Sequence, residues 1–452
     1  MFFDILAYEI FTSPLYSLAF DVTTQLIKNG LRKYSTHFRG EFIIGMKSVF
    51  TISPASARLT SFPKYSISCK DMQNLIYTLM NRETRLCDFI IEGEGELEFC
   101  KIVKTYAPLP FWCENIDSWV ADRSAAKHRS HVNKILELCG GKTKSGFIAL
   151  THCLSLTDTL WVKSERENVS WKDVNLYENR FDEVISKLSF DGNGLFGIQM
   201  STTSPELTSD GAYDKCWLNE KDGIHLIKAG SSGARNAGLE PYGEVLASQV
   251  FDKICSSVKY DLKKYDGRVV SDCKLFTSQE FGYRPIALFY KERLTLPKLL
   301  EIYREFNCED EFRRMVVADC ITLNSDRHFG NFGFLVNNES FERIALNPCF
   351  DFNMAFVPLA EDGFDFGTRA DGSKPDFDEY LSKRGPVIGS DYVAPARAIL
   401  TPEIKKCVED IRETPLSVPC DDKFTENRLS QMNMIKNVQC ERILGFDSKW
   451  EF

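Results

Sequence analysis

The chain has 452 residues, of which 43% are hydrophobic and 26% are charged, a composition typical of a soluble globular protein with two or three domains. Its net charge of −9 argues against direct nucleic-acid binding, because nucleic-acid-binding faces are basic. The 15 cysteines include no Cys-x-x-Cys pair and no zinc-ligand spacing, so we expect reduced thiols in a cytoplasmic protein.

The N-terminal stretch is apolar but does not have the pattern of a secretory signal. It has no basic residue before Lys28, and Asp4, Glu9 and Asp21 interrupt it, whereas a signal needs a basic start and an uninterrupted apolar centre. A membrane span needs roughly 18 consecutive apolar residues, and the sequence offers no such window. We therefore expect no membrane association.

Residues 1–149 are expected to form an extra α/β region without assigned chemistry. Apolar periodicity predicts helices at 21–31 and 122–139 and strands at 42–52 and 96–106. The second helix would end at the Gly140-Gly141 pair, a common stop signal.

Two glycine-containing stretches could contact phosphate. Residues 191–197 contain a G-x-G-x-x-G pattern, but no strand-to-helix context follows it, so a β-turn is the better interpretation. The second stretch lies between predicted strands, and its small and hydroxyl residues can bring backbone and side-chain donors close to phosphate oxygens. Its candidate ATP-binding residues are Thr208, Ser209, Gly211, Ala212 and Lys215.

Lys228 ends the strand predicted at 223–228, directly after this loop. A lysine placed there can reach the α- and β-phosphates of ATP, and Glu244 in the first turn of a helix at 240–254 could hold it extended. Each residue also has an ordinary explanation. Lys228 could be a strand-end lysine that extends to solvent, and Glu244 could be favoured by the helix dipole.

The next segments lead from this region to a polar loop. Strands are predicted at 258–260 and 268–276 around an Asp-Gly turn, and Phe276 ends the second where its backbone could meet adenine. Helices at 296–306 and 310–323 follow, and two further helices are predicted near the end of the sequence, at 402–413 and 426–444.

The polar loop contains Asp326 and Asn331, and Asp351 follows twenty positions later. A hairpin at 332–336 and 341–346 can bring Asn331 and Asp351 together. Kinases use this order of residues: the first Asp is the catalytic base that accepts the proton of the incoming hydroxyl, and the Asn and second Asp hold Mg²⁺.

An Asp/Asn-rich turn that caps a helix would explain each of these residues singly, but it explains the complete ordered set less well. Two neighbours are not assigned to the chemistry. Arg327 could offset phosphate charge or pair with an acidic group, and His328 is expected to be a packed, hydrogen-bonded residue rather than a ligand.

Three blocks of the sequence resemble the HipA-like kinases, the toxin-type serine/threonine kinases of bacteria. They are residues 209–215 with 226–228, residues 240–248, and residues 324–333 with 350–351. The Asp-Arg-His-x-x-Asn form of the third block also resembles the phosphoinositide kinases.

The resemblance implies an α+β, two-lobed kinase-like fold with ATP and Mg²⁺ in the cleft. The small β-rich lobe would span 150–285 and the larger helical lobe 286–452. It also implies a protein substrate such as a translation factor or an aminoacyl-tRNA synthetase, an antitoxin partner, and autophosphorylation of Thr208 or Ser209. The alternatives are a small-molecule or lipid kinase, and a pseudokinase that serves as a regulatory scaffold.

Overall fold

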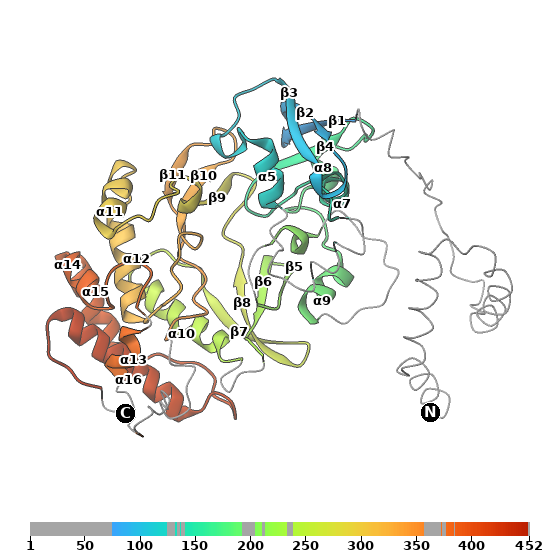
Figure 1. Ribbon diagram of the computed structural model, residues 1–452. Coiled ribbons are helices and arrows are strands. Elements are labelled where there is room, and N and C mark those ends of the chain that lie inside the picture. Colours follow the sequence, from blue (N-terminus) through green and yellow to red (C-terminus); the bar gives the residue numbers. More distant parts are fainter. Residues whose placement is uncertain are drawn as a thin grey trace, which may run out of the picture. The chain divides into compact units, whose positions relative to one another are not determined.

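The computed structural model describes residues 75–450, apart from 124–131, 133–135, 137–140, 192–203, 210–212, 233–237, 357–371, 373–376 and 384. Figure 1 labels the helices and strands. The chain divides into two compact units, 1–67 and 68–452, and every described residue belongs to the second.

The first sheet is antiparallel, with the strand order β3-β2-β1-β4. Its strands are β1 (Ile76–Asn81), β2 (Thr84–Glu92), β3 (Phe99–Thr105) and β4 (Leu160–Ser164). Leu79 and Phe89 are fully buried and share a hydrophobic cluster with Trp119 of α5 and Phe147 of α7. The sheet therefore buries one face against the helices α5 (Ile116–Arg123) and α7 (Lys144–Thr151).

The second sheet is also antiparallel, with the order β5-β6-β8-β7. Its elements are α9 (Glu183–Asp191), β5 (Lys215–Glu220), β6 (Gly223–Ala229), α10 (Glu240–Asp252), β7 (Tyr260–Tyr265) and β8 (Arg268–Lys274). Asp266 and Gly267 both have positive φ, 47° and 74°, as a tight hairpin turn requires. Helix α10 contacts β6, β7 and β8, so this sheet and α10 form one unit.

The third sheet has the order β11-β10-β9 and lies within the largest hydrophobic cluster. Its strands are β9 (Phe281–Pro285), β10 (Gly333–Asn337) and β11 (Arg343–Leu346), with helices α11 (Leu296–Glu305) and α12 (Glu309–Ile321) between β9 and β10. A Cβ at Gly333 would lie 2.1 Å from the carbonyl oxygen of Arg284, so β9 and β10 approach closely only because residue 333 is glycine.

The remaining helices are α8 (Trp171–Val174), α13 (Phe377–Ser382), α14 (Ala394–Ala398), α15 (Pro402–Glu413) and α16 (Glu426–Leu444). Thr401 and Thr425 cap the N-termini of α15 and α16 with their side chains. Among the helices of the described residues, none combines the length and the apolar composition needed to cross a bilayer.

Residues 154–158 connect the first sheet to the link between β8 and β9. The Thr277 hydroxyl and the Tyr177 hydroxyl both donate to the carbonyl oxygen of Leu156, and the Tyr283 amide donates to that of Thr157 at 2.9 Å. Asp158 is fully buried and pairs with two arginines, Arg123 of α5 and Arg284 of β9. The β8–β9 link is therefore held by the first sheet and its helices.

The predicted α+β class is confirmed, with a β-rich part followed by a mainly helical C-terminal part. Helices α15 and α16 begin and end where the sequence predicts. The strand expected at 258–260 instead runs over Tyr260–Tyr265, and the one expected at 96–106 is shortened by a 3₁₀ turn at Gly95–Leu97. The elements expected at 21–31 and 42–52, and most of the helix expected at 122–139, lie outside the described residues.

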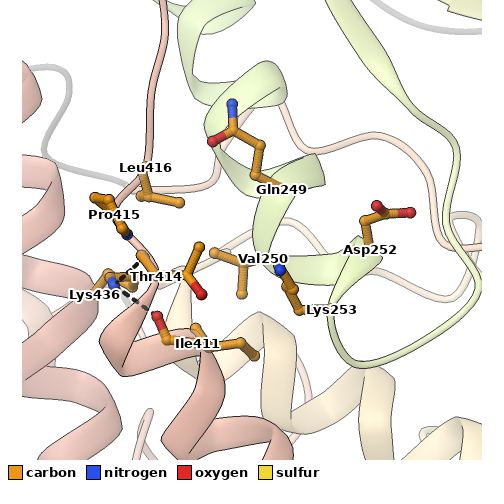
Figure 2. Close-up of a pocket in the computed structure, with 9 residues that line it drawn as sticks. All are labelled: Gln249, Val250, Asp252, Lys253, Ile411, Thr414, Pro415, Leu416 and Lys436. Carbon is orange, nitrogen blue, oxygen red and sulfur yellow. Dashed lines mark hydrogen bonds between the residues drawn. The ribbon is translucent and has the colours of Figure 1, made fainter.

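A cavity of about 160 Å³ lies between α10 and the C-terminal helices (Figure 2). Buried Lys436 lines it and donates to the carbonyl oxygens of Ile411, Arg412 and Thr414 at 2.7, 2.9 and 2.7 Å. These carbonyls lie at the C-terminal end of α15, where that of Ile411 also accepts the Thr414 amide at 3.3 Å. A cation there hydrogen-bonds all three and complements the helix dipole.

We predict that Lys436→Met lowers the free energy of unfolding by about 2 kcal/mol, because the apolar stem remains while three buried carbonyl oxygens lose a charged donor. Urea denaturation of the full chain measures this change. Lys406→Met on the exposed side of α15 is the matched control and should change the value by less than about 0.5 kcal/mol. Equal effects of the two substitutions would contradict this role of Lys436.

Candidate active site

Lys228 and Glu244 form a buried ion pair between the second sheet and α10. Lys228 Nζ lies 2.5 Å from Glu244 Oε1 and 2.7 Å from Asp351 Oδ1. The Ser271 hydroxyl of β8 donates to the other oxygen of Glu244. Burial alone would lower the pKa of the Lys228 ammonium, but Asp351 and Glu244 raise it well above its ordinary value. Lys228 is therefore a cation held in place by two carboxylates.

The polar loop after α12 is built around Arg327, whose side chain is fully buried. Its guanidinium donates to both oxygens of Asp319 on α12, with Nε 3.0 Å from Oδ2. Its Nη1 donates to two backbone carbonyls, those of Asn331 at 3.1 Å and Phe350 at 2.7 Å. One side chain therefore joins the loop to the residue before Asp351, which explains how the two chain segments converge.

Asp326 and Asn331 lie at the two ends of this loop. The Asn331 side-chain amide donates to the carbonyl oxygen of Asp326 at 3.0 Å, which turns its amide oxygen the other way. The Asp326 amide donates to Asn324 at 3.2 Å. Burial raises the pKa of the Asp326 carboxyl and Asp351 adds to the rise, whereas His328 and Lys228 oppose it. A raised pKa suits a group that accepts a proton.

Asp351 has left-handed backbone geometry, with φ of 61°. Burial alone would raise the pKa of its carboxyl, but the attraction of Lys228 lowers it below the usual value, so the carboxylate stays ionised at neutral pH. Together, the Asn331 amide oxygen and the Asp351 carboxylate are hard oxygen donors of the kind that Mg²⁺ prefers. The residues present therefore fit a magnesium ion.

The candidate phosphate loop is described in part. Gly211 and Ala212 lie outside the described residues, as does most of the 191–197 stretch. Lys215 begins β5 directly opposite Lys228 of β6, and its charge acts on Asp351. These two lysines therefore lie on adjacent strands near the same carboxylate.

Thr208 and Ser209 lie at the end of a short 3₁₀ turn, Pro205–Thr208. The Ser209 hydroxyl donates to the carbonyl oxygen of Pro205 at 2.7 Å and accepts from the Trp217 indole at 2.8 Å. The Thr208 hydroxyl makes a longer bond of 3.4 Å to the same carbonyl. The Ser209 hydroxyl is therefore the more firmly held of the two.

Phe276 follows β8 and belongs to an aromatic cluster. Its ring centroid lies 5.7 Å from that of Tyr283 and 5.3 Å from that of Phe350. The Tyr283 hydroxyl donates to the carbonyl oxygen of Gly330 in the polar loop at 2.7 Å. The segment that joins the second sheet to β9 therefore packs against Phe350, the residue before Asp351, while β9 itself contacts the loop.

Several residues of the site were missed or misjudged from sequence. Asp319 received no role, although its position on the helix before the loop, eight residues ahead of an unassigned arginine, was the available signal. Arg327 pairs with that acidic group rather than facing phosphate. His328 is exposed, so the expectation of a packed histidine is wrong, although its Nδ1 does accept the Gly330 amide at 3.0 Å.

A second group of possible metal ligands lies on the β5–β6 hairpin, at Glu220, Asp222 and His225. Lys263 Nζ lies 2.5 Å from Glu220 Oε1, and His225 Nδ1 lies 2.8 Å from Asp272 Oδ1. Because Lys263 pairs with Glu220 and Lys274 lies 3.9 Å from Asp222, we interpret the group as a surface ion-pair network. The cavity of Figure 2 contains none of the candidate active-site residues, since it lies at the C-terminal end of α10.

The solved structures that this chain resembles include two bacterial kinases. The HipA kinase of the Shewanella oneidensis toxin–antitoxin system, solved with HipB and operator DNA, is 11% identical, with a TM-score of 0.46 over 82% of this chain and 98% of that one. The Helicobacter pylori proinflammatory kinase CtkA is 18% identical, with a TM-score of 0.35 over 51% of this chain and 91% of that one.

No family model and no curated protein sequence matches the chain.

We predict that Arg327→Met lowers the free energy of unfolding by about 3–5 kcal/mol, because it leaves Asp319 buried without a counter-charge. Adding Asp319→Asn should recover part of that loss, since the uncompensated charge disappears. Urea denaturation of the full chain measures both variants.

The control is Arg304→Met, which breaks a bidentate ion pair whose arginine is largely exposed and should leave the free energy of unfolding nearly unchanged. If the double variant loses as much free energy of unfolding as the single variants Arg327→Met and Asp319→Asn lose together, the ion pair is not the cause of the loss.

Proposed function

We propose that the chain is an ATP-dependent phosphotransferase, with a protein serine or threonine hydroxyl as the acceptor. The observation that carries the proposal is Lys228, whose ammonium contacts Glu244 and Asp351 at once. A lysine paired with a helix glutamate next to a metal-binding aspartate is the phosphate-positioning arrangement of kinases. A buried lysine serving stability alone needs one counter-ion and no neighbouring loop of oxygen donors.

Each residue has a separate task in this proposal. Lys228 binds and orients the α- and β-phosphates, and Glu244 keeps its ammonium extended. Asn331 and Asp351 would hold Mg²⁺, and Asp326 accepts the proton of the acceptor hydroxyl and aligns its oxygen. When bound, Mg-ATP supplies the transferable phosphoryl group together with charge neutralisation. Gly211, Ala212, Lys215 and the hydroxyls of Thr208 and Ser209 would cover the phosphates, and the backbone at Phe276 would meet adenine.

The proposed biological setting follows from the sequence resemblance. The resemblance to HipA-like kinases supports a growth-controlling toxin with a protein substrate, such as a translation factor or an aminoacyl-tRNA synthetase, and an antitoxin partner. The cysteines of the described residues are free thiols, and Cys255 Sγ donates to Cys349 Sγ at 3.8 Å without a disulfide between them. Thiols this close remain reduced in a cytoplasmic environment.

The domain division at 1–149, 150–285 and 286–452 and autophosphorylation of Thr208 or Ser209 remain parts of the proposal. Thr208 is the better candidate for phosphorylation, because its hydroxyl is held less firmly.

Incubation of the protein with labelled ATP, Mg²⁺ and cell extract tests the proposal. We expect labelled protein with the wild type, and at least a hundredfold less label with Asp326→Ala and Asp351→Ala, the scale of a lost catalytic base or metal ligand. Asp410→Ala, at an exposed position on α15, is the control and should label as the wild type does.

The other assignments predict different results. Label found only in small molecules or lipid would favour a kinase for those acceptors. Nucleotide binding without transfer would favour a pseudokinase scaffold, against which the joint presence of Lys228, Asp326, Asn331 and Asp351 argues.

The raised pKa of Asp326 predicts the pH dependence of transfer. Below that pKa the carboxyl is protonated and cannot accept the hydroxyl proton, so kcat/KM should fall as the pH decreases through a value above that of an ordinary aspartate. Because His328 opposes the rise, His328→Ala should move this acidic limb to higher pH. A profile of log kcat/KM against pH for the two proteins measures the shift, and an unchanged limb would contradict the prediction.

A further inference from the structure

Asp351 occupies a backbone conformation that needs external support. Its φ of 61° lies in the left-handed region, which is unfavourable for a residue with a Cβ and persists only when surrounding contacts hold it. The Lys228 ammonium holds its carboxylate, and Arg327 holds the preceding carbonyl, that of Phe350. Neither contact reaches the amide of Asp351 itself.

The amide of Asp351 donates to the hydroxyl oxygen of Tyr260 at 3.0 Å. Tyr260 is the first residue of β7 and is buried, with 5% of its surface exposed. Cys273 lies directly opposite Tyr260 on β8, so the tyrosine is fixed in the second sheet by strand pairing.

The ring of Tyr260 is also held, which directs its hydroxyl. It packs edge-on against Phe352, with 5.5 Å between centroids, and Phe352 in turn packs on Phe251 of α10 at 4.3 Å. The Lys228 ammonium lies 5.8 Å from the centroid of the Tyr260 ring. Tyr260 therefore contacts Asp351 through its hydroxyl and Phe352 through its ring while it is anchored in the second sheet.

We infer that Tyr260 is a positioning residue for the magnesium site: its hydroxyl holds the Asp351 backbone in the left-handed conformation that presents the carboxylate beside Lys228. The Tyr260 hydroxyl belongs to the second sheet, as Lys228 does, whereas Asp351 belongs to the segment after β11. The hydrogen bond therefore fixes the position of the proposed metal ligand Asp351 relative to the proposed phosphate-binding residue Lys228. The metal part of the inference rests on the proposed function, whereas the backbone part does not.

Tyr260→Phe separates the hydroxyl from the packing of the ring, since phenylalanine keeps the contacts with Phe352. Tyr265→Phe is the matched control. It makes the same change on the same strand, at the end of β7 away from Asp351, where the ring packs edge-on against Phe190 at 4.9 Å.

The first measurement is hydrogen exchange of the backbone amides in residues 350–353 of the full chain, without nucleotide. We expect the Asp351 amide to exchange about tenfold faster in Tyr260→Phe, the factor that corresponds to the loss of about 1.4 kcal/mol of hydrogen-bond protection. Tyr265→Phe should match the wild type. Unchanged exchange in Tyr260→Phe would overturn the inference, whether or not the protein proves to be a kinase.

The second measurement is the Mg²⁺ dependence of phosphoryl transfer from ATP. We expect Tyr260→Phe to need about tenfold more Mg²⁺ for half-maximal rate, with near wild-type rates at saturating Mg²⁺. A variant that is slower at every Mg²⁺ concentration, or that shows an unchanged Mg²⁺ requirement, would overturn the positioning role. If the wild type transfers no phosphate, the proposed function fails, and the exchange experiment still decides whether Tyr260 holds Asp351.

Discussion

The candidate active site depends on the buried ion pair between Arg327 and Asp319. A guanidinium removed from water is costly unless its charge and its donors are all satisfied. Here two carboxylate oxygens and two backbone carbonyls do so, and each acceptor belongs to a segment that must be positioned. Helix α12 thereby fixes the positions of the polar loop and of Phe350, the residue before Asp351. The geometry of the candidate site is therefore fixed by Arg327, a residue that takes no part in the proposed chemistry.

The charges of the site are arranged so that each holds its neighbour in the required ionisation state. Lys228 lowers the pKa of Asp351, and Asp351 with Glu244 raises that of Lys228. Asp326 lies outside this ion pair and has a raised pKa because its burial is not offset to the same degree. One carboxylate is thus suited to bind a cation and the other to accept a proton, by the same separation of roles found in other carboxylate pairs.

Much of the fold and of the site could be predicted from local sequence. The α+β class, the hairpin after Asn331, and the bounds of α15 and α16 follow from periodicity, turn residues and caps, which act over a few positions. Lys228 also proved to contact both Glu244 and Asp351. The pairing of Arg327 with Asp319 and the contact of Tyr260 with Asp351 could not be predicted in the same way. Arginine, aspartate and tyrosine are ordinary at those positions, and only the tertiary structure gives them partners.

The connection between the first sheet and the β8–β9 link has a consequence for folding during synthesis. The Asn81 side chain at the end of β1 donates to the carbonyl oxygen of Asn338, 257 positions later, and Arg82 reaches Gln279 across 197 positions. Contacts of such sequence separation are slow to form because long loops must close first. The ribosome must deliver the chain past β10 before the first sheet can acquire all its partners. Until then the turn between β1 and β2 lacks these partners in the nascent chain, and association of the partly folded first sheet with other chains can compete with folding.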